Sequence, residues 1–294
     1  MTGDRIDALR AALSRSREKA TGPRLDAETF LGLRDLIASS SGIDFDENSR
    51  YIVERRLLPR LQALRLDDFA GYYRALLFGE DRESEFERLL EAVTIRETYF
   101  FRECAQLHAL RDDVLPELSQ MNAESRRVRI WSAGCASGEE PYSVAMLVAS
   151  HPSIAGWEVN IVGTDLIASA VEAARSGVFR DGALRATSDE QRARYFEHEG
   201  PNVWRLDERV RKQVTLERRN LLDGPPPDSE PFDVILCRNV LLYFSDAARR
   251  RAVEIFHDAL REGGWLLLGH AESLLSMRTP FRLVHLGRDV VYRR

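Results

Sequence analysis

The stretch Val128-Arg-Ile-Trp-Ser-Ala-Gly134-Cys-Ala-Ser-Gly138-Glu-Glu140-Pro141 decides the fold class of this 294-residue chain. Apolar residues at its start are typical of a buried strand, and a turn of small residues follows. A helix then begins with two acids and a proline in its first turn. Glycines at 134 and 138 allow a ligand close to the backbone, because a Cβ atom there would obstruct it. The stretch predicts a strand, a ligand-binding turn and a helix in succession.

The two acids at the start of this helix restrict the ligand class. A phosphate-binding loop offers bare N–H groups and a lysine, whereas Glu139 and Glu140 would repel an anion. A carboxylate here suits a ligand that carries an ammonium or a sulfonium group. S-adenosylmethionine carries both, so it is the ligand that we expect.

Composition narrows the class of protein. The 44% hydrophobic content supports a real core, and nothing resembles a signal peptide or a membrane span. The three scattered cysteines lack metal-ligand spacing and fit a reducing compartment. A net charge of −5 argues against nucleic acid as the main partner. We expect a cytoplasmic protein with no metal site, no membrane insertion and no nucleic-acid partner.

The chain divides into a helical part and an alternating part. Apolar residues at helical spacing predict three or four short helices in an all-helical N-terminal domain over 1–90. Residues 1–22 are expected to form a loosely packed leader helix, with a docking helix as the alternative.

Strands and helices alternate in the second part, which we assign to one α/β domain over 91–294. Several strands are nearly all apolar, which is expected of parallel strands that are buried on both faces. The pattern therefore predicts a doubly wound sheet. The expected strands are 128–134, 158–164, 213–219, 232–238, 264–269, 281–286 and 289–293, and the helices are 139–151, 168–176 and 245–262.

Suitable side chains follow successive predicted strands at their carboxyl ends, where such sheets bind ligands. Asp165 could accept both hydroxyls of a ribose, and Asn220 with Leu221 could contact an adenine edge and face. Arg238 and Asn239 follow the next strand. The G-x-G-x-x-G pattern of dinucleotide sites is missing. Each signal is weak alone, but their succession predicts a nucleoside-containing ligand.

A series of short motifs runs from about residue 26 to the C-terminus: Gly42-Ile43, Arg55-Arg-Leu-Leu-Pro-Arg60, Leu66-Asp-Asp-Phe69, Thr94-Ile-Arg-Glu-Thr-Tyr-Phe-Phe-Arg102-Glu103, Trp131-Ser132, Ser137-Gly-Glu-Glu-Pro-Tyr-Ser143, Thr164-Asp165, Cys237-Arg-Asn-Val240 and Leu268-Gly-His-Ala-Glu-Ser273. In this order they resemble the CheR family, the chemotaxis receptor methyltransferases that methylate receptor glutamates with S-adenosylmethionine.

The resemblance implies a fold, a cofactor and a partner. The fold is a Rossmann-like methyltransferase sheet with a terminal antiparallel strand, a small β subdomain inserted at 192–215 and the helical N-terminal domain. The cofactor is S-adenosyl-L-methionine, with S-adenosyl-L-homocysteine as product. The partners are the cytoplasmic methylation helices of chemoreceptors, and we expect a monomer.

Site residues are implied by matching position. Arg102 and Tyr243 would hold the substrate carboxylate as catalytic residues, Glu140 the methionine end of the cofactor and Asp165 the ribose. Two positions depart from the family: Arg96 stands where many relatives have Asn, and Ile167 replaces a common second acid. The implied cofactor-binding residues are Arg96, Thr98, Arg102, Gly134, Glu140, Asp165, Asn220, Leu221, Arg238 and Asn239.

The implied reaction needs no base, because a glutamate with an ordinary pKa of about 4.3 is ionised at neutral pH. His270 is therefore expected to cap a strand end. The alternative for Arg102 is a salt bridge to Glu97 or Glu103, and for Tyr243 a place in the core.

Two features of the sequence bear on substrate recognition. Arginines 50, 55, 56, 60 and 65 could dock an acidic receptor helix or form a solvated face. The insertion carries a short turn with the single glycine Gly200, which predicts an enzyme that does not need a receptor C-terminal pentapeptide. Two rival functions remain: a methyltransferase for another protein or small molecule, and a non-catalytic module that senses S-adenosylmethionine.

Overall fold

The computed structural model describes residues 22–227, 230–287 and 289–294. The chain forms two compact units. One joins the chain up to Leu36 with Phe45–Val93, and the other joins Ile37–Asp44 with Thr94–Arg294. Residues 1–21 of the predicted leader helix lie outside the described residues. Among the described residues, no helix is long and apolar enough to cross a membrane.

The first unit is helical, as predicted. Its interior holds an ion pair in which Arg60 donates two hydrogen bonds to Glu85, at 2.9 and 2.6 Å, and Tyr72 donates a third at 2.9 Å. Arg60 therefore stabilises this unit and is not a freely solvated member of the arginine series. The helices are α2 (Ala27–Ser41), whose last turn belongs to the second unit, η1 (Glu47–Ser49), α3 (Arg50–Leu64), α4 (Phe69–Phe78) and α5 (Arg82–Val93).

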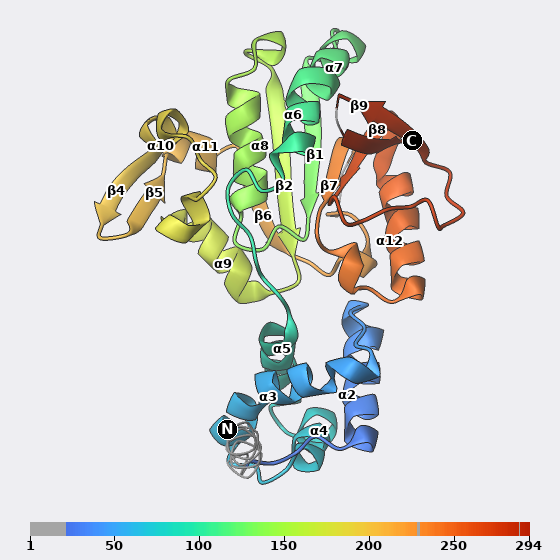
Figure 1. The fold of residues 1–294 in the computed structure, drawn as a ribbon. Helices are drawn as coiled ribbons and strands as arrows, with labels where there is room; N and C mark the ends of the chain where they lie inside the picture. The colour runs from blue at the N-terminus through green and yellow to red at the C-terminus, as the bar shows by residue number, and fades with distance from the viewer. Residues whose placement is uncertain (1–21, 228–229, 288) are drawn as a thin grey trace, which may run out of the picture. The chain divides into compact units, whose positions relative to one another are not determined.

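The second unit is built on a seven-stranded sheet in the order β6-β2-β1-β7-β8-β10-β9 (Figure 1). The first five of these strands are parallel, whereas β10 runs antiparallel to β8 and β9. This confirms the doubly wound sheet with a terminal antiparallel strand. The strands are β1 (Arg127–Ala133), β2 (Glu158–Asp165), β6 (Val214–Arg218), β7 (Phe232–Cys237), β8 (Leu260–Leu268), β9 (Arg282–Leu286) and β10 (Asp289–Arg293).

Helices cover both faces of the sheet because strand side chains alternate between faces. Val128 and Ile130 of β1 join the core that includes residues of α6, α7 and α8. Trp131 points to the other face, where its ring lies 5.8 Å from that of Phe256 in α12. The helices of this unit are α6 (Cys104–Ala109), η2 (Leu110–Val114), α7 (Leu115–Met121), α8 (Glu139–Ala149), η3 (Pro152–Ile154), α9 (Ala168–Ser176), η5 (Leu221–Asp223), η6 (Leu241–Tyr243) and α12 (Asp246–Ala259).

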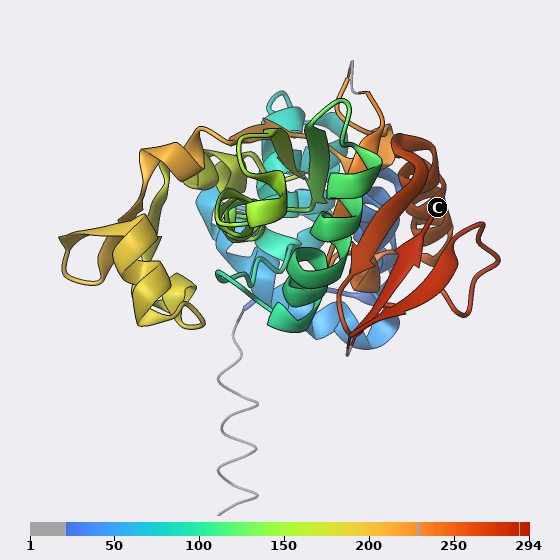
Figure 2. The same ribbon diagram turned by 90° about the horizontal axis from the view of Figure 1, so that it is seen from above.

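A small second sheet lies at the edge of this unit in both ribbon views (Figures 1 and 2). It contains β3 (Val178–Arg180), β5 (Val203–Leu206) and β4 (Phe196–Gly200), in that order, with η4 (Asp181–Leu184), α10 (Asp189–Tyr195) and α11 (Glu208–Arg211) nearby in the chain. The turn between β4 and β5 is short, since Gly200 pairs directly with Val203. Phe100 packs edge-on against Phe179 and Phe196 of this sheet, with ring centroids 4.7 and 4.9 Å apart.

The predicted C-terminal end of the helix over 245–262 is wrong. The helix stops at Ala259, and Leu260 already begins β8 with extended backbone (φ −78°, ψ 147°). Leu260 is fully buried and pairs with Phe232, so burial at the start of the strand overrides the two glycines that suggested a later helix end.

Candidate functional site

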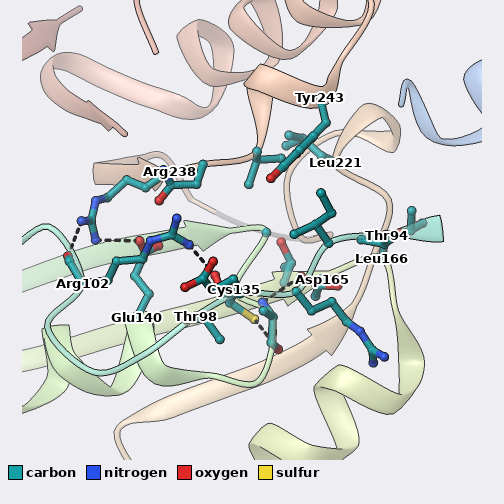
Figure 3. A pocket seen from close by; sticks show the side chains of 18 of the residues that line it. Thr94, Thr98, Arg102, Cys135, Glu140, Asp165, Leu166, Leu221, Arg238 and Tyr243 are labelled. Carbon is teal, nitrogen blue, oxygen red and sulfur yellow. Dashed lines mark hydrogen bonds and ion pairs between the residues drawn. The ribbon is translucent and has the colours of Figure 1, made fainter. Parts of the chain in front are cut away.

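The carboxyl ends of β1, β2 and β7 meet at an open pocket, whose empty space together with its solvent-filled mouth is about 1040 Å³ (Figure 3). The order of the sheet reverses between β1 and β7, and doubly wound sheets bind ligands at such a point. The predicted site residues all line this pocket: Arg96, Thr98, Arg102, Gly134, Glu140, Asp165, Asn220, Leu221, Arg238, Asn239 and Tyr243.

Glu140 supplies a largely buried negative charge at the first turn of α8. Ser132 Oγ donates to Oε1 of this carboxylate at 2.7 Å, and Arg238 Nη1 donates to Oε2 at 3.1 Å. Burial raises the pKa of Glu140, while the Arg238 charge and both hydrogen bonds oppose that rise. A second cation that entered the pocket would further stabilise the ionised carboxylate.

Arg238 ties the end of β7 to the segment before α6. Its side chain is only 2% exposed. Besides Glu140 it binds Gln106, with Nε donating to Oε1 at 2.7 Å, and Nη2 donates to the main-chain carbonyls of Arg102 and Glu103. Figure 3 shows the guanidinium between Glu140 and the Arg102 carbonyl. The residue therefore acts as a bridge between three parts of the pocket wall.

The turn after β1 has no room for side chains at its first glycine. Gly134 has a φ of +83°, and a Cβ atom there would lie 2.4 Å from Val240 Cγ2.

The Asp165 carboxylate is held by two main-chain N–H groups. Ala136 N donates to Asp165 Oδ2 at 2.8 Å and Ile167 N donates to Oδ1 at 2.9 Å. Burial raises the pKa of Asp165, and these two bonds oppose it. Each carboxylate oxygen keeps a second acceptor site that ligand hydroxyls could use.

The Asn220 side-chain amide bonds to the main chain through both its oxygen and its nitrogen. Its Oδ1 accepts from Leu222 N at 3.1 Å, and its Nδ2 donates to the Ser40 carbonyl at 2.6 Å. The amide thus anchors the backbone at both ends. Asn220 and the buried Leu221 both line the pocket.

Sequence reasoning missed a pocket wall that comes from the end of α2. Ser41 and Ile43 line the pocket. Ile43 pairs with Phe244 in an antiparallel bridge, and Asp44 N donates to the Tyr243 carbonyl at 2.9 Å. The Gly42-Ile43 motif was visible in the sequence, but nothing local indicated that it would contact residues two hundred positions later.

Arg102 and Tyr243 reach the pocket from different sides (Figure 3). The Arg102 guanidinium donates to the Glu97 carbonyl and lies 3.9 Å from Glu103, so part of the salt-bridge alternative is present. A guanidinium has five N–H donors, which leaves capacity for an incoming carboxylate. Tyr243 is half-buried and directs its hydroxyl into the pocket.

Glu103, which the sequence suggested only as an alternative salt-bridge partner of Arg102, joins several of these groups. It accepts from Asn239 Nδ2 at 3.0 Å and from the His270 main-chain N–H at 3.1 Å, and the His270 ring lies 2.8 Å from it. Burial raises the pKa of Glu103, but the bonds from Asn239 and His270 outweigh it and the net pKa is lowered. His270 is 72% exposed and is not among the described pocket residues.

Two further observations concern Arg96 and metal binding. Arg96 Nη1 donates to Ser169 Oγ at 3.2 Å, and its charge acts on Asp165. In the part of the chain that the structure describes, no group of three or more His, Cys, Asp or Glu side chains could hold a metal ion.

Comparisons with known proteins agree with the geometry. Residues 28–94 match the family described as "CheR methyltransferase, all-alpha domain", and residues 96–290 match "CheR methyltransferase, SAM binding domain". The chain is 33% identical to "Chemotaxis protein methyltransferase 2" of Vibrio cholerae, over 90% of this chain and 91% of that protein. It is 33% identical to "Chemotaxis protein methyltransferase 1" of Pseudomonas aeruginosa, over 91% and 97%. The corresponding protein of Borreliella burgdorferi is 30% identical over 81% and 86%. A largely buried carboxylate that favours a cation and an acid at the end of β2 fit S-adenosylmethionine. The chain belongs to the CheR methyltransferase family, which uses this cofactor.

Proposed function

We propose that this protein methylates glutamate side chains of chemoreceptors, giving glutamyl methyl esters and S-adenosylhomocysteine. One observation carries the proposal: a guanidinium and a phenol, from Arg102 and Tyr243, reach a single pocket whose other wall holds Glu140 and Asp165. Arg and Tyr can both donate to a carboxylate, so they fit an acidic substrate.

The pocket residues need to align and desolvate the reactants rather than move protons. S-adenosylmethionine supplies a methyl group on a positively charged sulfur. In the proposed reaction the ionised substrate carboxylate would attack that methyl carbon in line, so that the O–C bond forms as the S–C bond breaks. The sulfur would keep the electron pair of the broken bond in S-adenosylhomocysteine, and both charges would disappear. Arg102 and Tyr243 would orient the carboxylate. Because the charge falls toward the transition state, an excessively strong grip on the anion would stabilise the ground state more than the transition state.

Three residues are proposed to hold the cofactor. Glu140 would bind the ammonium group of the methionine end, since its buried carboxylate is stabilised by added positive charge. Asp165 would accept from the ribose hydroxyls, and Leu221 would pack on the adenine. Arg238 would act indirectly by orienting Glu140.

The first test measures the chemistry of the product. Protein is mixed with methyl-labelled S-adenosylmethionine and receptor-containing membranes, and the product is treated with alkali. We expect label in receptor protein that alkali releases as volatile methanol, the mark of a carboxyl methyl ester. Protein-bound label that survives alkali would contradict glutamate as the acceptor. Cofactor binding without any transfer would favour a sensing module.

The same assay addresses the receptor C-terminus, because the short β4–β5 turn supports independence from a C-terminal pentapeptide. A receptor and its copy without the last five residues are compared as substrates. We expect kcat/KM values within about twofold, which is less than 0.5 kcal/mol of binding free energy. A tenfold loss on truncation would reject independence.

The pKa of Glu140 predicts how cofactor binding depends on pH. Burial raises this pKa above the ordinary 4.5, and the ionised form is the one that binds an ammonium. Affinity for S-adenosylhomocysteine should therefore fall as the pH drops through the raised pKa. The stability of the ligand-free protein should change with pH in the opposite direction. A carboxyl pKa that is higher in the folded than in the unfolded state contributes stability at low pH, and this contribution is lost as the pH rises through the raised pKa.

Calorimetric titration with S-adenosylhomocysteine between about pH 5 and pH 8 checks this expectation. Glu140→Gln should bind more weakly at the upper pH and show a flatter dependence, with Asp165 supplying any remaining slope. An unchanged slope in this variant would show that Glu140 does not hold the ammonium.

A further inference from the structure

The Glu272 carboxylate gathers four backbone N–H groups from two segments. Its Oε2 accepts from Asn239 and Gly269, both at 2.7 Å. Its Oε1 accepts from Val240 at 2.9 Å and from Leu242 at 3.2 Å. A carboxylate has about four acceptor positions, so these bonds fill its capacity.

These bonds serve a stretch of backbone that has no sheet partner. β7 ends at Cys237, and Asn239 takes a left-handed conformation with a φ of +61°. Asparagine adopts left-handed backbone more readily than most residues with a side chain, but the bend takes the main-chain N–H groups out of the sheet ladder, so they need other partners. Glu272 satisfies the N–H groups on both sides of this bend.

The neighbouring glycine leaves space for this arrangement. A Cβ atom on Gly269 would lie 2.7 Å from Glu272 Oε2 and 2.9 Å from the Asn239 main-chain nitrogen. Such contacts are shorter than real Cβ atoms show, so a side chain at 269 would displace either the carboxylate or the turn. Two residues of one motif, Leu268-Gly-His-Ala-Glu-Ser273, thus act on the same bend.

The bend leads directly to the substrate side of the pocket. Asn239, Val240 and Tyr243 line the pocket, whereas Glu272 is not among its described lining residues. Tyr243 N donates to the Val240 carbonyl at 3.1 Å, which transmits the position of the turn to the tyrosine. From the opposite side, Glu103 holds the Asn239 side chain at 3.0 Å.

We propose that Glu272 is a positioning residue that sets the Tyr243 hydroxyl by fixing the backbone of residues 239–242. It touches neither cofactor nor substrate and acts through the turn. This role rests on the proposed function only where it concerns methyl transfer; the position of Tyr243 can be measured without turnover.

The test compares Glu272→Gln with wild type and with the control Glu262→Gln, an exposed glutamate on β8. Glutamine keeps the size of the side chain but turns an NH₂ toward backbone donors. We expect kcat to fall about 10- to 100-fold in Glu272→Gln, with the KM for S-adenosylmethionine within about threefold and the control close to wild type. Glu272→Asp should lose less, because it keeps a carboxylate.

A double-variant cycle separates positioning from general support. In a Tyr243→Phe background, Glu272→Gln should lower kcat by less than about threefold, because the group that it positions is already missing. An equal fall in both backgrounds, or a loss of melting temperature with unchanged kcat per folded molecule, would overturn the proposal.

Two readouts need no catalysis. Amide hydrogen exchange at residues 239, 240, 242 and 269 should accelerate in Glu272→Gln while the other strands stay protected. The fluorine resonance of 3-fluorotyrosine introduced at Tyr243 should shift or broaden. If wild type transferred no methyl group, the proposed function would fail, yet these readouts would still support positioning; unchanged exchange and resonance would reject it.

Discussion

Arg238→Met is expected to destabilise the protein by about 3–5 kcal/mol, the cost of removing one partner of a buried ion pair. The variant leaves Glu140 without its cation and Gln106 Oε1 without its donor. Because Arg238 opposes the rise in the Glu140 pKa, its loss should raise that pKa further. Affinity for S-adenosylhomocysteine should also fall, on the order of a hundredfold, as the carboxylate loses its orientation.

Chemical denaturation and calorimetric titration measure the two effects. Arg282→Met is the matched control, since Arg282 is exposed on β9. The double variant Arg238→Met/Glu140→Gln should be more stable than Arg238→Met alone, because the Glu140 charge is no longer stranded, while Glu103, 3.7 Å from Arg238, keeps its bonds from Asn239 and His270. If the double variant were no more stable, the destabilisation would come from lost packing instead of an unpaired carboxylate.

Gly134→Ala is expected to abolish measurable cofactor binding and to lower the free energy of unfolding by roughly 2–5 kcal/mol. About 1–2 kcal/mol comes from a side chain at a φ of +83°, and about 1–3 kcal/mol from overlap with Val240, whose Cγ2 would lie 2.4 Å from the new Cβ. Relief of this overlap moves either the turn or Val240, and both line the pocket.

A double variant separates the steric contribution from the backbone contribution to the loss of stability. Gly134→Ala/Val240→Ala should regain the part that is due to overlap and keep the part that is due to backbone conformation. Gly182→Ala serves as control, because a Cβ atom at Gly182 meets nothing within 4 Å. If the added Val240→Ala gave no recovery in either denaturation or binding, steric overlap would not be the cause.

The fold was largely predictable because parallel strands that are buried on both faces appear as apolar runs. β7, predicted at 232–238 and found at Phe232–Cys237, is buried along its whole length. The end of α12 was not predictable in this way, since the residue that stops the helix, Leu260, does so by pairing with Phe232 in another part of the chain.

The same distinction between local and distant determinants applies to the residues of the candidate site. Asp165 is the last residue of β2, and Glu140 lies in the first turn of the helix that follows β1, so the local chain places both at the ligand edge. Glu103 and Glu272 could not be recognised as participants from local pattern, because their partners are distant and, for Glu272, are main-chain N–H groups that every residue except proline carries. Asn220 lines the pocket as expected, whereas the bond from its amide to the Ser40 carbonyl was not visible in the sequence because that carbonyl is equally remote.

The wall formed by Ser41 and Ile43 bears on how relatives of this protein could exchange domains. The two family segments meet near residue 95, which suggests a simple border for recombination. Ile37–Asp44, however, belongs to the catalytic unit although it lies within the helical segment. A helical domain acquired whole from a relative would therefore bring foreign residues into the candidate site. Lineages that inherit both segments together keep the Ser40–Asn220 and Ile43–Phe244 pairings intact, which favours joint inheritance over free shuffling.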